Sequence, residues 1–315
     1  MRRLNYEQKD LGYSFALTTT VMVASALVLG LIFGAVDGGW QYWLMQALYT
    51  ALIGGSAFVY AAISKTHIGS ATGISKRPRL SHIAWGCAGV FFLILCMSQI
   101  NNLFLNLLEA LGLNRPSVEL EDNLAGLIIC ACILPAFAEE IVFRGTVAMS
   151  LRSSKNKLAA LAISGALFSI FHANPAQTLH QFVLGAFLTL LVFRSGSLWT
   201  SVIVHLLNNA AVVALSYTPL GSDEFWSLQD NAAWALPLAV VGLVGFAACV
   251  FGYLQTTKSC WQTDSADGLA GEDTGEVADE AVSDLTFAKN KKASTTALLV
   301  AIFVCAVMWV LQLLV

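Results

Sequence analysis

The sequence predicts an all-α fold, a polytopic transmembrane helix bundle of about nine spans. Composition is the first observation behind this prediction: 57% of the 315 residues are hydrophobic and 12% are charged, roughly half the charged share of a soluble domain. Mean hydropathy is correspondingly high, at +0.69. The second observation is the recurrence of apolar runs long enough to cross a bilayer core of ~30 Å. These properties exclude an ordinary soluble globule.

The apolar runs give the expected elements in chain order. Each is expected to be one transmembrane helix, and the first exceeds the apolar region of a signal peptide, so we expect it to be retained. The approximate bounds are 12–35, 42–63, 82–111, 123–150, 158–173, 177–193, 197–216, 232–255 and 294–315.

Charge in the short loops predicts the orientation. Basic residues lie before the first run and then in every second loop, whereas the alternate loops are mainly acidic. By the positive-inside rule, the N-terminus is cytoplasmic and the C-terminus lies outside. We therefore expect an integral multi-pass protein, in the cell membrane of a bacterium.

The chain divides into five expected regions. They are three N-terminal spans (1–122), a helical core (123–216), an eighth span with its flanks (217–257), an acidic linker (258–293) and a ninth span (294–315). The linker is too poor in apolar residues to offset chain entropy, so we expect it to be disordered and cytoplasmic. No basic patch interleaved with aromatic residues is present, which argues against a nucleic-acid partner. The expected surroundings are the lipid bilayer.

Three of the apolar runs carry polar and ionisable residues in a similar way. The run 123–150 contains Glu139, Glu140 and Arg144; the two others contain Phe168 with His172, and His205 with Asn209. A charged side chain at membrane depth costs ~2.5 kcal/mol or more, so such residues indicate a functional site. A spacing of four residues places Glu140 and Arg144 on one helix face, and the same holds for each of the other two pairs.

The depths of these residues also agree. Counted from the nearest flanking basic residue at ~1.5 Å per residue, Glu139, His172 and His205 lie at roughly 20, 22 and 17 Å. A shared site inside the membrane is therefore geometrically possible. Glu140 is expected to pair with Arg144, whereas Glu139 points ~100° away from it and remains free for general-base chemistry. His180 is expected to be a packing or interfacial residue.

The three motifs Glu139-Glu140-x-x-x-Arg144, Phe168-x-x-x-His172 and His205-x-x-x-Asn209 resemble those of the CPBP family of intramembrane proteases. That family includes the type II CAAX prenyl endopeptidases and the bacterial Abi proteins. The resemblance covers roughly 124–215. It implies that Glu139 and His172 activate the hydrolytic water and that His205 and Asn209 hold the oxyanion, while Glu140, Arg144 and Phe168 support the architecture. The substrate would be a peptide or protein near the membrane surface.

Metal dependence is left open by the residues. Glu139, His172 and His205 could complete a zinc site with water as the fourth ligand, and members of the family are often described as metalloproteases. The same residues equally allow a metal-free glutamate mechanism. No His-Glu-x-x-His pair lies on one helix, so the sequence does not favour zinc.

Two alternative functions belong to other classes. Buried Glu, His and Arg residues also build proton relays, as in a proton-coupled transporter, although we find no internal repeat of the kind that many transporters show. The other alternative is a non-catalytic membrane partner, such as a bacteriocin-immunity factor that acts by binding. The sequence indicates neither the substrate, prenylated or not, nor the oligomeric state.

Overall fold

The computed structural model describes residues 5–34, 39–114, 123–257 and 280–314. Within these ranges the protein is built of helices and contains no strand. Eight helical segments are long and apolar enough to cross a membrane. The all-α membrane bundle expected from the sequence is therefore confirmed.

The long helices follow the predicted runs closely. They are α1 (Asp10–Phe33), α2 (Trp40–Ile63), α4 (Leu80–Ala110), α9 (Thr178–Ser195), α10 (Leu198–Ser216), α11 (Leu228–Thr256) and α13 (Glu280–Leu314), with a composite span over 124–151. The run 158–173 differs from the prediction: α8 covers only Lys157–Phe171, 15 residues, and is shorter than the other spans. Its end is set by Ala173, which has a left-handed backbone (φ 47°) that a helix does not accommodate.

The composite span alternates between α-helical and π-helical turns. In order it contains α5 (Leu124–Gly126), η1 (Leu127–Ile133), α6 (Leu134–Val142), η2 (Phe143–Val147) and α7 (Ala148–Leu151). Pro135 lies in the first turn of α6 and has no N–H to donate to the preceding turn, which disfavours regular α-helical bonding there. The short helix α6, which carries both glutamates, is thus bounded on each side by a π-helical stretch. Such stretches occur frequently at functional sites.

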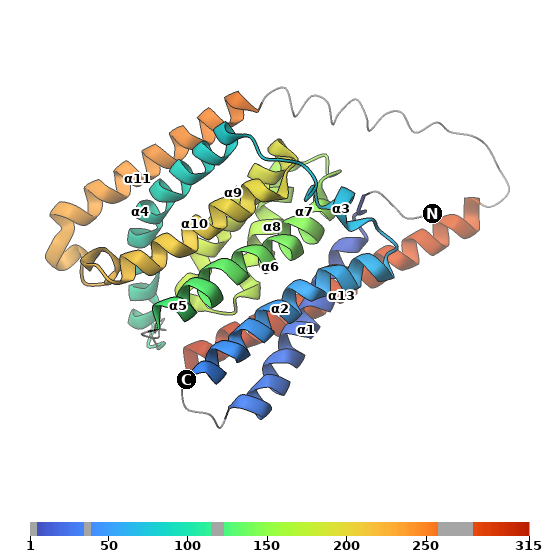
Figure 1. Cartoon of the computed structure of the whole chain (residues 1–315), viewed down its shortest axis with the longest axis horizontal. Coiled ribbons are helices and arrows are strands. Elements are labelled where there is room, and N and C mark those ends of the chain that lie inside the picture. The colour runs from blue at the N-terminus through green and yellow to red at the C-terminus, as the bar shows by residue number, and fades with distance from the viewer. Residues whose placement is uncertain (1–4, 35–38, 115–122, 258–279, 315) are drawn as a thin grey trace.

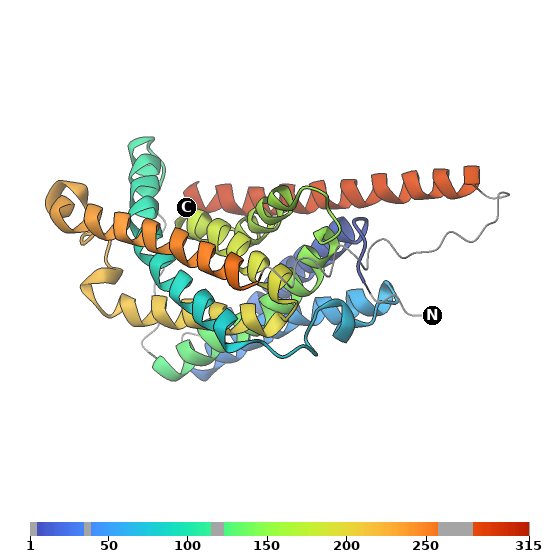
Figure 2. The ribbon, with the colours of Figure 1, turned by 90° about the horizontal axis from the view of Figure 1, so that it is seen from above.

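The helices form three groups in space (Figure 1). Helices α4 and α11 pack along each other on one side, and α1, α2 and α13 pack together on the other. The segment from α5 to α10 lies between these groups in Figure 1, and Figure 2, from above, shows α13 along one edge and α2 towards the opposite edge. The predicted catalytic core is therefore enclosed by the N-terminal and C-terminal spans.

Helix α13 begins earlier than the ninth span that the sequence predicts. The structure starts it at Glu280, so 280–293, which we expected to be disordered, is helical. This stretch contains neither Gly nor Pro, so the helix of the span can continue into it. Farther along, α13 packs closely on α1, where a Cβ on Gly12 would lie 1.9 Å from the carbonyl oxygen of Ser294. The rest of the expected linker, 258–279, is outside the described residues.

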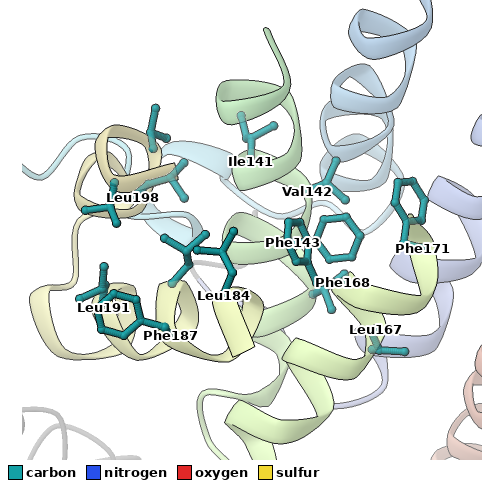
Figure 3. Close-up of a cluster of buried hydrophobic side chains, with 14 of the residues drawn as sticks. Ile141, Val142, Phe143, Leu167, Phe168, Phe171, Leu184, Phe187, Leu191 and Leu198 are labelled. Atoms are coloured by element: carbon teal, nitrogen blue, oxygen red, sulfur yellow. The ribbon is translucent and has the colours of Figure 1, made fainter. Parts of the chain in front are cut away.

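The apolar core lies where the central segment meets its neighbours. Figure 3 shows Phe143, Phe168 and Phe171 clustered beside each other, with Leu184 of α9 nearby and Leu191 farther away, beside Phe187. The rings of Phe143 and Phe168 are 5.0 Å apart and pack edge to face. This aromatic cluster fixes α8 against η2 and thereby positions the polar residues that lie one turn away.

The cysteines form no disulfide framework in the described part of the chain. The free thiols are Cys87, Cys96, Cys130, Cys132, Cys249 and Cys305, all buried or half-buried. They therefore act as small apolar side chains in the helix packing. Cys260 lies outside the described residues.

Candidate active site

Glu140 and Arg144 form a fully buried ion pair. Arg144 Nη1 donates to Glu140 Oε1 at 2.7 Å, and both side chains are 0% exposed. Arg144 Nη2 also donates to the carbonyl oxygen of Gly185 on α9, at 3.3 Å. The pairing expected from the four-residue spacing is present, and it additionally ties the composite span to α9.

His205 joins this pair from α10. Its Nδ1 lies 2.8 Å from Glu140 Oε1, and the residue is 1% exposed. Because a carboxylate only accepts hydrogen bonds, Nδ1 must carry a proton. Nε2 can then donate to an oxyanion only when the ring carries both protons. The structure thus gives His205 a role in the buried network that its motif did not predict.

Glu139 faces a different partner. Its Oε2 lies 3.5 Å from His172 Nε2, and the two side chains are 18% and 16% exposed, in contrast to the sealed Glu140 pair. His172 Nδ1 donates to the carbonyl oxygen of Phe168 at 2.8 Å. Since that oxygen can only accept, Nδ1 carries the ring proton. In the neutral ring, Nε2 therefore has no proton and is a hydrogen-bond acceptor. Two acceptor atoms, one carboxylate and one imidazole, therefore face each other.

The turn after α8 explains the position of His172. The helix ends at Phe171 and His172 is its C-terminal cap. The left-handed Ala173 follows, and Asn174 caps the short helix η3 (Pro175–Gln177) by accepting from the N–H of Ala176 at 2.9 Å. The imidazole thus lies at a fixed helix end, where the chain turns into α9.

Phe168 lies between the two networks. The Arg144 guanidinium carbon lies 4.1 Å from the centre of its ring, which is a favourable cation–π distance. The rings of His172 and His205 pack edge to face on it, with centroids at 4.6 and 5.8 Å. Phe168 therefore positions Arg144 and both histidines, consistent with the support role that we expect for it.

Asn209 is linked to two residues that were not predicted to be functional. Asn208 Nδ2 donates to Asn209 Oδ1 at 3.1 Å, and Asn208 Oδ1 lies 3.0 Å from His180 Nε2 on α9. His180 is also close enough to His172 and His205 to interact with both electrostatically. His180 thus makes a specific hydrogen bond to Asn208 at the packing position expected for it.

Sequence patterns pointed only partly to these additional residues. Asn208 adjoins the third motif, but its orientation towards α9 requires the helix packing. Tyr49 of α2 is close enough to Glu139 to interact with it electrostatically, and nothing in the sequence around Tyr49 indicates this. In each case the missing information is the rotation of one helix against another.

The three candidate metal ligands do not form a metal site. His205 Nδ1 is directed at Glu140, whereas His172 Nε2 is directed at Glu139. Over the described ranges, no group of three or more His, Cys, Asp or Glu side chains is arranged to hold a metal ion. The guanidinium of Arg144 beside this cluster further disfavours a second cation. The donor set does not fit zinc, so we derive no step through a metal.

A comparison with known protein families matches the segment that carries these residues. Residues 121–211 match the family described as "Type II CAAX prenyl endopeptidase Rce1-like". We call residues 121–211 the CPBP segment, because their motifs resemble those of the CPBP family and their sequence matches this family model. All three motifs, from Glu139 to Asn209, fall inside the matched range.

A relative in Bacillus subtilis (strain 168) matches as well. The protein described as "Putative membrane peptidase YdiL" is 30% identical over 94 residues, which is 30% of this chain and 38% of the relative. The chain thus matches little more than a third of that protein. No solved structure matches the chain. The likeness concerns the CPBP segment, while spans α1, α2, α4, α11 and α13 lie outside the matched family range.

Proposed function

We propose that the protein is an intramembrane endopeptidase that hydrolyses a peptide bond of a membrane-associated protein or peptide. The observation that carries this proposal is the facing pair of Glu139 Oε2 and His172 Nε2, 3.5 Å apart. Both side chains are partly exposed, whereas Oε2 itself is buried and has no hydrogen-bond partner among the described residues. The CPBP family match of the same segment supports it. The cytoplasmic N-terminus expected from loop charge is part of the proposal.

Glu139 and His172 are arranged to activate water. Both Oε2 and the neutral Nε2 are acceptors, so a water molecule that lies beside the pair can donate a hydrogen bond to each. As the water oxygen attacks the carbonyl carbon of the peptide, Glu139 takes the proton as general base. The same proton then passes to the leaving amine nitrogen as the C–N bond breaks. His172 holds the water as a hydrogen-bond acceptor through its fixed tautomer.

The developing oxyanion requires hydrogen-bond donors. The amide of Asn209 supplies N–H donors in every protonation state, and His205 Nε2 supplies one when its ring is doubly protonated. Removal of one such donor in a preorganised site costs about 10²–10³ in kcat. Glu140, which is paired with Arg144, holds His205 through a fully buried hydrogen bond. Neither Glu140 nor Arg144 takes a direct part in bond cleavage.

The family description suggests which substrates should be tested first. We propose a peptide with a Cys-a-a-X end carrying a farnesyl group, compared with the same peptide without the lipid. An enzyme that requires the prenyl group cuts only the first peptide, whereas one that processes unmodified membrane peptides cuts both. A library of peptides from membrane proteins extends the test to other sequences.

The decisive experiment uses the full chain in proteoliposomes with these peptides. Glu139→Gln and His172→Ala are each expected to lower kcat by about 10²-fold or more. Glu224→Gln is the matched control, because Glu224 is an exposed carboxylate away from the site, and its activity should equal that of the wild type. Wild-type cleavage by Glu139→Gln would show that the proposed base is wrong.

A further inference from the structure

His180 lies outside the three motifs, yet it starts a hydrogen-bonded chain that ends at the oxyanion donor. It sits in the first turn of α9, and its Nε2 lies 3.0 Å from Asn208 Oδ1 on the neighbouring helix α10. Asn208 is 2% exposed. A buried amide held by a partner on another helix has a restricted orientation, because any other orientation loses hydrogen bonds that water does not replace.

The chain has a defined direction. Asn208 Nδ2 donates to Asn209 Oδ1 at 3.1 Å, so the other end of the Asn208 amide, Oδ1, is the atom that faces His180. An amide oxygen only accepts, and His180 must therefore donate from Nε2. Each member donates to the next one, from His180 to Asn208 to Asn209.

This direction decides which end of the Asn209 amide faces a substrate. Its oxygen is occupied as the acceptor from Asn208, so its NH₂ group remains to donate elsewhere. A reversed Asn209 amide would place NH₂ against the NH₂ of Asn208, two donors without an acceptor. The chain therefore selects the orientation in which Asn209 can stabilise an oxyanion.

We infer that His180 is a positioning residue, which acts through Asn208 to fix the Asn209 amide in its oxyanion-binding orientation. This inference rests on the proposed function. It assigns a catalytic contribution to a residue of α9 that makes no contact with the peptide bond. Residues that contact a catalytic group on the side away from the substrate commonly determine how accurately that group is placed. A displacement of ~1 Å can cost about 10²-fold in rate.

The test is a double-mutant cycle in the farnesylated-peptide assay, with kcat and KM measured separately. Asn209→Ala is expected to lower kcat by about 10²–10³-fold, and His180→Ala by about 10- to 100-fold, with KM unchanged. In the Asn209→Ala background, His180→Ala should change kcat by less than about two-fold, because its effect passes through Asn209. Equal effects of His180→Ala in both backgrounds would overturn the inference.

Two further variants separate positioning from a general loss of structure. His180→Gln retains an N–H donor and should restore most of kcat, whereas Asn208→Asp keeps the acceptor for His180 but cannot donate to Asn209 and should not. Gln181→Ala is the matched control, since Gln181 is the next residue of α9 and bonds to Gln177 instead. Thermal unfolding of every variant confirms folding.

Failure of the inference is distinct from failure of the proposed function. If Glu139→Gln abolishes cleavage while His180→Ala behaves as the wild type, the protease proposal stands and the positioning role is wrong. If Glu139→Gln leaves cleavage unchanged, the proposed function itself is wrong. If Asn208→Asp retains the wild-type kcat, the direction of the chain is wrong.

Discussion

His205 and Glu140 share a hydrogen bond of 2.8 Å inside the bundle. The same Glu140 oxygen also accepts from Arg144 at 2.7 Å, so one carboxylate oxygen joins α10 to the composite span. We therefore expect the two neighbouring glutamates to act differently, Glu139 in the proposed catalysis and Glu140 in folding stability. Glu139 is the partly accessible one, and Glu140 is the sealed one.

Glu140→Gln should mainly affect stability. The amide still accepts a hydrogen bond, but the positive charge of Arg144 is left unpaired, and breaking a buried ion pair in this way costs about 3–5 kcal/mol. The free energy of unfolding in a detergent titration measures the loss, with Glu224→Gln as control. Replacing both partners, Glu140→Gln with Arg144→Met, should recover part of it, and a double variant less stable than the single one contradicts this explanation.

Phe168→Leu tests the ring that contacts Arg144 and both histidines. Leu fills most of the volume but lacks the aromatic face, whose cation–π contact is worth up to ~2 kcal/mol when desolvated. We expect the free energy of unfolding to fall by about 2 kcal/mol and kcat to fall with it. Phe182→Leu in the half-exposed part of α9 should cost less than Phe168→Leu in the same titration. Equal losses would assign no special role to Phe168.

Gly165→Ala tests the close approach of α8 and α9. A Cβ on Gly165 would lie 2.5 Å from the backbone oxygen of Phe182, so the helices must move apart. Overpacking of this kind costs about 1–3 kcal/mol. Gly30→Ala is the matched control, because no atom of the described residues would lie within 4 Å of a Cβ added to Gly30. Thermal unfolding should show a lower Tm for Gly165→Ala alone, and a parallel decrease for Gly30→Ala would point to a general effect.

Chelators should leave cleavage unchanged. The candidate ligands are divided between two networks, one at Glu139 and one at Glu140, and do not surround a common point. Incubation of the reconstituted protein with a zinc chelator, followed by the peptide assay and metal analysis of the sample, measures this. Loss of activity that added zinc restores would show that the side chains rearrange around a metal, contrary to this prediction.

The sequence predicted the helices well because apolar length is a local property. It also predicted the ion pair of Glu140 with Arg144, since both residues lie on one helix at a fixed spacing. It did not predict that His205 turns towards Glu140, nor that His180 reaches Asn208. Both contacts depend on how α9 and α10 are rotated against their neighbours, and an all-apolar helix gives no periodic signal for that rotation.

The end of α8 also differs from the run predicted from the sequence. The run 158–173 continues through His172 and Ala173 with apolar composition, and hydropathy alone does not reveal that Ala173 takes a left-handed backbone. The two π-helical stretches around α6 were equally invisible to hydropathy. The catalytic roles of Glu139, His172, His205 and Asn209 remain predictions that the proposed assays test.

The 15 residues of α8 extend over about 23 Å at ~1.5 Å per residue, less than the ~30 Å of a bilayer core. Hydrophobic mismatch of this size is met by local thinning of the bilayer or by tilting of neighbouring helices. The mismatch occurs at α8, the helix whose C-terminal cap is His172. We therefore expect the proposed site to respond to lipid chain length: a thinner bilayer should bring interfacial water closer to His172, and a thicker one should move it away.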